Sequence, residues 1–166
     1  PSRTRRPLRI FAALGSPGDD NLVLKAARGL AEASGRPPHA AITLTKRLPV
    51  GGGLGGGSSY AATTRLALNG LWGTRLSIQE LAALGLKLGA DVPVCLAGRP
   101  ARMTGIGEIV TPLPSLPPLA CVLVNPRLPV PTPQVFAGLA SRQNPPLPDM
   151  PTVAFTSAEA FCAWLD

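Results

Sequence analysis

The sequence has few of the residues that build many common catalytic and metal sites. Among 166 residues there is one histidine, there are three cysteines, and aromatic residues make up only 4%. The histidine, His39, stands in the turn-like segment GRPPHAA, which predicts a surface loop. With a single histidine in a predicted surface loop, the sequence offers neither a Ser/His/Asp triad nor a histidine-based metal centre. We expect no metal site built from the chain's own ligands.

The cysteines Cys95, Cys121 and Cys162 are odd in number and widely spaced. This spacing excludes a disulfide framework and matches no zinc-ligand pattern. We expect all three to be buried small apolar residues.

Long apolar runs are also missing. No run approaches the roughly 20 residues that a membrane-spanning helix needs. The basic segment PSRTRRPLRI is not followed by the apolar region and cleavage site of a secretory signal. These absences predict a soluble, cytoplasmic protein without a membrane partner. The length suits one compact domain, or one domain and the beginning of another.

The net charge of +7 suggests an anionic partner. Nucleic acid is disfavoured, because stacking aromatics are scarce and the basic residues are scattered beyond SRTRR. An anionic small molecule and a simply solvated surface both remain open readings.

Hydrophobic periodicity and capping residues predict an alternation of strands and helices in the first 90 residues. We expect a strand at Leu8–Ala12, a helix capped by Asp19 or Asp20 and stopped by Gly35, a strand at Ala41–Thr45, a helix capped by Ser58 or Ser59, and a helix opened by a Ser77/Glu80 capping box.

After Asp91 the pattern changes to short apolar segments between Gly and Pro turns. VPVCLAG, ARMTGIGEIVTPL and LACVLVNP predict strands, and VPTPQVFAGL predicts a proline-rich stretch that becomes briefly helical. RQNPPLPDMPTV reads as a linker, and Ser157 is expected to cap a last helix.

The segment LPVGGGLGGGSSYAA places six glycines in the seven positions Gly51–Gly57, interrupted only by Leu54. It satisfies G-x-G-x-x-G, but the acidic residue about 20 positions on, Glu80, falls in a predicted helix rather than at a strand end. No lysine follows the last glycine as a Walker A loop requires, and the valine and strand lysine of a protein-kinase loop do not appear. A flexible linker is disfavoured by the flanking strand and apolar helix.

Glycines without Cβ atoms let successive backbone N–H groups converge, and the following helix points its positive end at the same place. The glycine segment therefore predicts an anion site. The hydroxyls of Ser58 and Ser59 could bind a phosphate or Mg²⁺ there.

Asp91, in LGADVPVCLAG, has no cationic residue closer in sequence than Lys87. One reading is a turn or capping aspartate. The other is a general base or charge stabiliser for phosphoryl transfer.

Five ordered segments resemble the GHMP kinases: DDNLVLKAARGL, LPVGGGLGGGSSYAA, GADVPV, GIGEIVTPL and VPTPQVF. The expanded glycine form is closest to the branch that acts on diphosphocytidyl methylerythritol. The resemblance implies an α+β fold, the GHMP kinase amino-terminal domain (ribosomal protein S5 domain 2-like), over residues 1–143. Residues 144–166 would be a linker and the start of a carboxy-terminal GHMP domain.

The implied activity is Mg²⁺- and ATP-dependent phosphorylation of the 2-hydroxyl of diphosphocytidyl methylerythritol, a small-molecule substrate of non-mevalonate isoprenoid synthesis. Asp91 would be the catalytic base, Asn21 and Lys46 would contact the nucleotide base, and Thr132 would lie near the cytidine end. The ATP phosphates would contact Pro49, Val50, Gly51, Gly52, Gly53, Leu54, Gly55, Gly56, Gly57, Ser58 and Ser59.

The sequence departs from the family in several places. Nothing before Asp19 matches the amino-terminal K-x-N motif with its catalytic lysine, and the histidine-containing segment and the second glycine-rich segment are also missing. Tyr60 stands where a smaller polar residue is common. We expect a chain truncated at both ends, by about 50 residues in front, and inactive by itself. Another GHMP kinase, of homoserine or mevalonate type, and a non-catalytic nucleotide-binding relative remain as alternatives.

Overall fold

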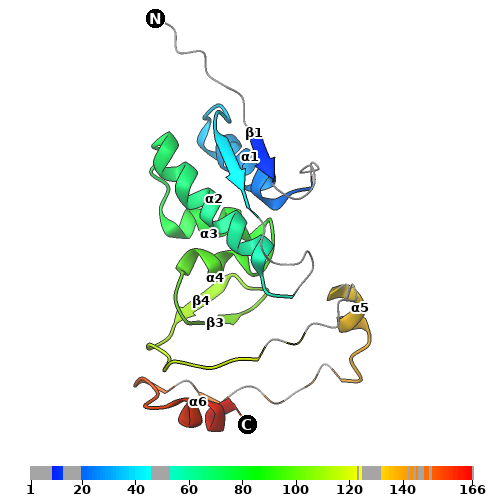
Figure 1. Ribbon diagram of the computed structural model, residues 1–166, viewed down its shortest axis with the longest axis vertical. Coiled ribbons are helices and arrows are strands. Elements are labelled where there is room, and N and C mark those ends of the chain that lie inside the picture. Colours follow the sequence, from blue (N-terminus) through cyan, green and yellow to red (C-terminus); the bar gives the residue numbers. More distant parts are fainter. Residues whose placement is uncertain are drawn as a thin grey trace, which may run out of the picture.

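The computed structural model describes residues 9–12, 20–45, 53–122, 124, 132–141, 143, 145, 148, 149 and 151–165; for residues 9–12, 132 and 133 it describes the backbone alone. The elements, in chain order, are β1 (Arg9–Ala12), α1 (Leu22–Ser34), β2 (Ala41–Leu44), α2 (Gly56–Trp72), α3 (Ile78–Leu86), α4 (Val92–Ala97), β3 (Ala101–Thr104), β4 (Ile109–Pro112), α5 (Thr132–Ala137) and α6 (Ala158–Leu165) (Figure 1).

Two small sheets flank the helices in the described part of the chain. Strands β1 and β2 pair in parallel, with Arg9 opposite Ala41 and Ala12 opposite Leu44, and α1 provides the crossover between them. Strands β3 and β4 form an antiparallel hairpin, with Thr104 opposite Ile109. The mixture of helices and small sheets confirms the α+β prediction.

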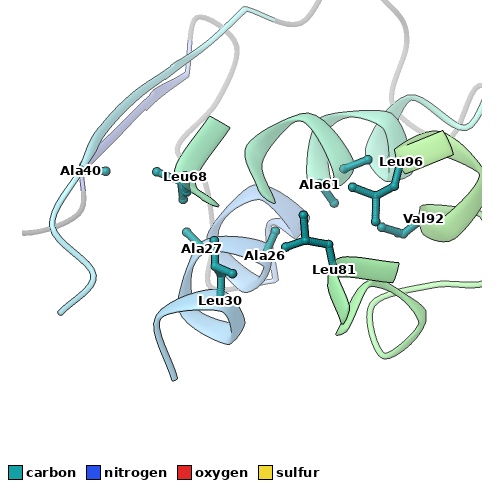
Figure 2. Packing of buried hydrophobic residues seen from close by; sticks show 10 residues of the cluster. Ala26, Ala27, Leu30, Ala40, Ala61, Leu68, Leu81, Val92 and Leu96 are labelled. Atoms are coloured by element: carbon teal, nitrogen blue, oxygen red, sulfur yellow. The ribbon is translucent and has the colours of Figure 1, made fainter. Parts of the chain in front are cut away.

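The core lies where α1, α2, α3 and α4 meet (Figure 2). Small residues on α1 and α2 let these two helices approach closely, and larger side chains from α3 and α4 fill the remaining space. The buried residues of this core are Ala26, Ala27, Leu30, Ala40, Ala61, Ala62, Leu68, Leu81, Val92 and Leu96.

Two glycines show how tightly the helices pack. A Cβ atom built on Gly57, in the first turn of α2, would lie 3.1 Å from Leu22 Cδ1 in the first turn of α1. A Cβ atom on Gly29 would lie 3.3 Å from Arg65 Nη2. Helices α1 and α2 therefore run side by side in the same direction, and both begin at the same end of the domain.

Several predicted elements are confirmed. Helix α1 ends at Gly35, which is in the left-handed conformation, and α6 is capped by Ser157, whose Oγ accepts from Ala160 N at 3.2 Å. The capping box of α3 is also present: Glu80 N donates to Ser77 Oγ at 3.2 Å, and Ser77 N donates to Glu80 Oε2 at 2.7 Å.

Other predictions were wrong. The N-cap of α1 is Asn21 rather than Asp19 or Asp20, and α2 begins at Gly56 with Gly55 as its N-cap rather than Ser58 or Ser59. VPVCLAG forms helix α4 instead of a strand, because Pro93 fits the first turn of a helix and Gly98 ends it. In LACVLVNP, the described residues 119–122 and 124 are not in a strand.

The cysteine and histidine predictions also need correction. Cys121 and Cys162 are exposed, and Cys95 is half-buried. His39 lies in the loop between α1 and β2 as predicted, but it is half-buried, and its carbonyl accepts from Trp72 Nε1 at 3.0 Å.

None of the helices in the described ranges has the length and apolar character needed to cross a bilayer.

Candidate functional site

The described part of the glycine segment forms a tight turn that leads directly into α2. Gly53 and Gly55 have φ angles of 70° and 64°, in the left-handed region that favours glycine. Gly55 is the N-cap and offers no side-chain cap, and the first backbone bond into the helix runs from Ser59 N to Gly55 O at 2.9 Å. Among the described residues, no acceptor is recorded for the N–H groups of Gly56, Gly57 and Ser58.

Three backbone donors therefore converge at the start of a 17-residue helix. The helix macrodipole adds positive potential at the same end. With no Cβ atoms at Gly55, Gly56 and Gly57, an anion can approach the backbone closely. This geometry could accept an anion, and the phosphate-binding role of the loop stays a prediction.

Ser58 and Ser59 lie in the first turn of α2 rather than at its cap. Ser58 is half-buried and Ser59 is exposed. No hydrogen bond of either hydroxyl to a described residue is recorded, so each hydroxyl can turn toward a ligand at the loop.

Asn21 begins α1 beside this loop, since Leu22 meets the first turn of α2 at Gly57. Its Oδ1 accepts from Val23 N at 2.9 Å and caps the helix. The side-chain NH₂ group is left for other partners, so the base-contact role of Asn21 stays a prediction beside its capping role.

Asp91 is the N-cap residue of α4, yet its side chain makes no capping hydrogen bond. It is exposed, and none of the described cations forms a salt bridge with it. Cys95 follows one helical turn later, and its N–H donates to the carbonyl oxygen of Asp91 at 3.2 Å. Burial of the Cys95 thiol, and to a lesser degree the charge of Asp91, raise the pKa of that thiol. Asp91 thus presents an available carboxylate, which is what a base needs.

Helix α4 brings Asp91 to the half of α2 that follows the glycine loop. Val92, the next residue, is fully buried and packs with Leu96 against the region of Ala61 (Figure 2). Ala61 lies in the second turn of α2. The structure therefore brings Asp91 and the glycine loop to the same part of the domain, as a phosphoryl-transfer site requires.

A cavity of about 430 Å³ lies between β2 and α2, beside the loop. Tyr60, directly after Ser59, contributes to its lining, as do Val23 of α1 and Thr45 at the end of β2. Sequence reasoning missed this cavity, because it arises from the packing of segments distant in the chain.

The described structure gives no support near the loop for the other predicted site residues. Lys46, Pro49, Val50, Gly51 and Gly52 lie outside the described residues. Thr132 begins α5, which does not pack extensively on α1, α2, α3 or α4 (Figure 1). The role of Thr132 near the cytidine end stays a prediction.

Within the described ranges, no group of three or more His, Cys, Asp or Glu side chains could hold a metal ion. Any Mg²⁺ at this site would therefore depend on ligand phosphates as well as on isolated protein oxygens.

Residues 21–99, which include the described part of the loop and Asp91, match the family described as "GHMP kinases N terminal domain". This match, like the similarities below, makes residues 21–99 similar to the amino-terminal domain of the GHMP kinases.

Similar proteins narrow the comparison within that family. The chain is 51% identical, over 152 residues, to the 4-diphosphocytidyl-2-C-methyl-D-erythritol kinase of Rhodospirillum rubrum, covering 90% of this chain and 50% of that protein. It is also 51% identical over 152 residues to the protein of the same name from Paramagnetospirillum magneticum, and this match covers 89% of this chain and 52% of that protein.

A solved structure titled "Crystal structure of 4-(cytidine 5'-diphospho)-2C-methyl-D-erythritol kinase" matches with a TM-score of 0.66 and 42% identity, over 81% of this chain and 47% of that one. The chain spans about half the length of the curated relatives it matches.

Proposed function

We propose that the full-length protein containing this sequence is an ATP-dependent kinase that phosphorylates the 2-hydroxyl of 4-diphosphocytidyl-2-C-methyl-D-erythritol. The observation that carries the proposal is the pairing of an uncapped, glycine-lined helix start with an available carboxylate, Asp91, on the neighbouring helix. The name shared by the similar proteins supports the choice of acceptor.

In this proposal the phosphates of ATP lie against the start of α2. The N–H groups of Gly56, Gly57 and Ser58 donate to phosphate oxygens, and the helix dipole stabilises their negative charge. Donors fixed by the fold need no reorganisation as charge develops during transfer.

Asp91 acts on the acceptor. Its carboxylate accepts the proton of the substrate hydroxyl as that oxygen forms a bond to the γ-phosphorus of ATP. The bond between the γ-phosphorus and the bridging oxygen breaks, and ADP leaves with the electron pair. Positioning and electrostatics carry most of the rate in such a reaction, so the placement of Asp91 by α4 matters more than its basicity.

Mg²⁺ fits the donor set at the loop. Ser58 offers a hydroxyl oxygen without a recorded partner, and Mg²⁺ is usually bound by few protein oxygens together with substrate phosphates and water. When bound, the ion neutralises charge on the phosphate oxygens.

The nucleotide base would occupy the cavity beside Tyr60. Thr45 lines this cavity and Lys46 follows it in sequence, while Asn21 lies two residues before Val23, which also lines it. A mostly apolar cavity of about 430 Å³ can accept a flat ring next to the phosphate cradle.

A coupled ADP-release assay on the full-length protein tests the proposal. We expect ADP formation to depend on 4-diphosphocytidyl-2-C-methyl-D-erythritol, with homoserine and mevalonate as comparison acceptors. Turnover that is no faster with the diphosphocytidyl compound than without it would refute the substrate. A protein that binds ATP but turns over none of the three acceptors would be a nucleotide-binding relative without catalysis.

A further inference from the structure

Arg65 is a charged side chain that α2 carries into the interior of the domain. Its side chain is among the largest that are fully buried, and the residue is only 2% exposed. Nη2 donates to the carbonyl oxygen of Leu84 at 3.1 Å, whereas Nε and Nη1 are buried without a hydrogen-bond partner.

A guanidinium group has five N–H donors, of which Nε carries one and Nη1 carries two. Three buried donors of Arg65 therefore lack an acceptor. The carbonyl of Leu84 is neutral and cannot balance the charge, and no described acid forms a salt bridge with Arg65. A buried cation is unfavourable unless it is paired, so this arrangement calls for an anion.

Space for such an anion lies next to the guanidinium. A cavity of about 310 Å³ between α1, α2 and the end of α3 is lined by Arg65 together with Lys25, Gly29, Glu32 and Lys87. The absence of a side chain at Gly29 contributes to this space, because a Cβ atom there would lie 3.3 Å from Arg65 Nη2.

The charges around the cavity are mainly positive. Lys25 forms a salt bridge with Asp20 at 2.8 Å, while Lys87 is exposed and has no salt bridge with a described residue. Glu32 is the single acid of the lining. With Lys25 balanced by Asp20, Arg65 and Lys87 stand against Glu32 alone and leave the cavity with an excess of one positive charge.

We propose that this cavity binds a phosphate-type oxyanion, either inorganic phosphate or the phosphate group of a small monoester, held by Arg65 and Lys87. An oxyanion in the cavity supplies the opposite charge, and a rotation of the guanidinium toward it would give the unpartnered donors an acceptor. The site is separate from the glycine loop, since Arg65 lies eight positions, about 12 Å, beyond Gly57 along α2. The inference does not rest on the proposed kinase activity.

Calorimetric titration of the full-length protein with inorganic phosphate tests the site. A non-hydrolysable ATP analogue and Mg²⁺ are kept saturating so that the glycine loop is occupied, and ionic strength is held constant. We expect saturable binding of one phosphate, weakened at least tenfold by Arg65→Met and clearly weakened by Lys87→Met. Absence of saturable binding, or equal binding by both variants and the wild type, would overturn the proposal.

Lys87→Met keeps the test decisive if Arg65→Met fails to fold, because Lys87 is on the surface. Arg36→Met changes an exposed arginine outside this cavity and should leave phosphate binding unchanged. Acetate should bind much more weakly than phosphate, and equal binding would contradict a phosphate-type site. If methyl phosphate binds as tightly as inorganic phosphate, the ligand is a phosphate monoester. If inorganic phosphate binds clearly more tightly, the ligand is the free ion.

Glu32→Gln separates the proposal from an internal pairing of Glu32 with Arg65. The Glu32 carboxylate is negative, as phosphate is, so its removal from the lining should strengthen phosphate binding. If Glu32 were the real partner of Arg65, the variant would melt at a lower temperature without stronger phosphate binding, and the proposal would fail.

Discussion

Gly107, in the turn between β3 and β4, packs directly on the backbone of Ala90, the residue before Asp91. Gly107 is buried and has a φ of 102°. A Cβ atom built there would overlap the carbonyl oxygen of Ala90 and lie 3.1 Å from its Cα. Glu108 steadies the same turn, because its Oε2 accepts from Ile106 N at 2.6 Å. The hairpin therefore supports the segment that positions Asp91.

Gly107→Ala should impair catalysis through this contact. The new methyl group must push the Ala90 backbone away and move Asp91 with it, and the positive φ adds about 1–3 kcal/mol of strain. We expect kcat to fall at least about tenfold with a smaller change in ATP affinity, since misplacement of a catalytic group acts mainly on the chemical step. Steady-state kinetics and nucleotide binding on the full-length protein measure both.

Gly98→Ala is the matched control for backbone strain. Gly98 ends α4 with a φ of 61°, and a Cβ atom there would have no neighbour within 4 Å. This variant should lose a similar amount of stability while keeping kcat. If both variants lost activity equally, general destabilisation rather than the Ala90 contact would be the cause.

Asp91→Asn should remove the base while leaving the fold intact. The carboxylate makes no capping hydrogen bond, so the melting temperature should change little. We expect ATP affinity within about tenfold of the wild type and kcat lower by a factor of about 10² or more, as for loss of a positioned base. Asp149→Asn, another exposed carboxylate, is the control. A near-normal rate in Asp91→Asn rules out the role given to this residue.

Gly55→Ala should weaken ATP binding. Gly55 is the N-cap of α2 with a φ of 64°, and relaxation of the strained alanine would disturb the N–H groups that follow it. Loss of one charge-assisted hydrogen bond to phosphate corresponds to an affinity about tenfold lower or worse. Gly73→Ala is the control, because Gly73 caps the other end of the same helix at a φ of 59°. Equal ATP affinities in the two variants would argue against a phosphate site at Gly55.

The capping box of α3 predicts a pH dependence of stability. Two hydrogen bonds lower the pKa of Glu80 below the ordinary value of 4.5. The larger effect comes from the backbone N–H of Ser77 and the smaller from its side chain. A lowered folded-state pKa means that the ionised carboxylate stabilises the fold above the unfolded-state pKa, and that this contribution is lost as pH falls through the folded-state pKa. The stability difference between wild type and Glu80→Gln should be present at neutral pH and vanish in acid.

Thermal unfolding across this pH range measures the difference. In a Ser77→Ala background, Glu80→Gln should have a smaller but still measurable effect, because the hydroxyl hydrogen bond to Glu80 is lost while the larger contribution, from the backbone N–H of residue 77, remains. An undiminished effect in that background would show that the Ser77 hydroxyl does not contribute to the pKa shift of Glu80.

Local signals were sufficient for part of this structure. The Ser77/Glu80 capping box, the stop at Gly35 and the Ser157 cap were each predicted from a few neighbouring residues, because capping chemistry is local. The glycine segment predicted that a helix follows it, but the N-cap was expected at Ser58 or Ser59 and is Gly55.

Helix α4 shows where sequence reasoning fails. VPVCLA is a short apolar run, and such a run is compatible with either a buried strand or a buried helix. Its packing against α2 and α3 decides the outcome, and a Cβ atom on Gly85 would lie only 2.8 Å from Val92 Cγ1. The contact of Gly107 with Ala90 and the isolation of Arg65 likewise depend on residues brought together by the fold, so a single sequence could not reveal them.

The most direct test of the central claim is ³¹P NMR of the reaction catalysed by the full-length protein. With ATP, Mg²⁺ and 4-diphosphocytidyl-2-C-methyl-D-erythritol, the γ-phosphate signal of ATP should be replaced in equal amount by a new phosphomonoester signal on the acceptor, and Asp91→Asn should suppress this conversion. Conversion of ATP to ADP and inorganic phosphate without a phosphomonoester, or equal conversion by Asp91→Asn, would contradict the account.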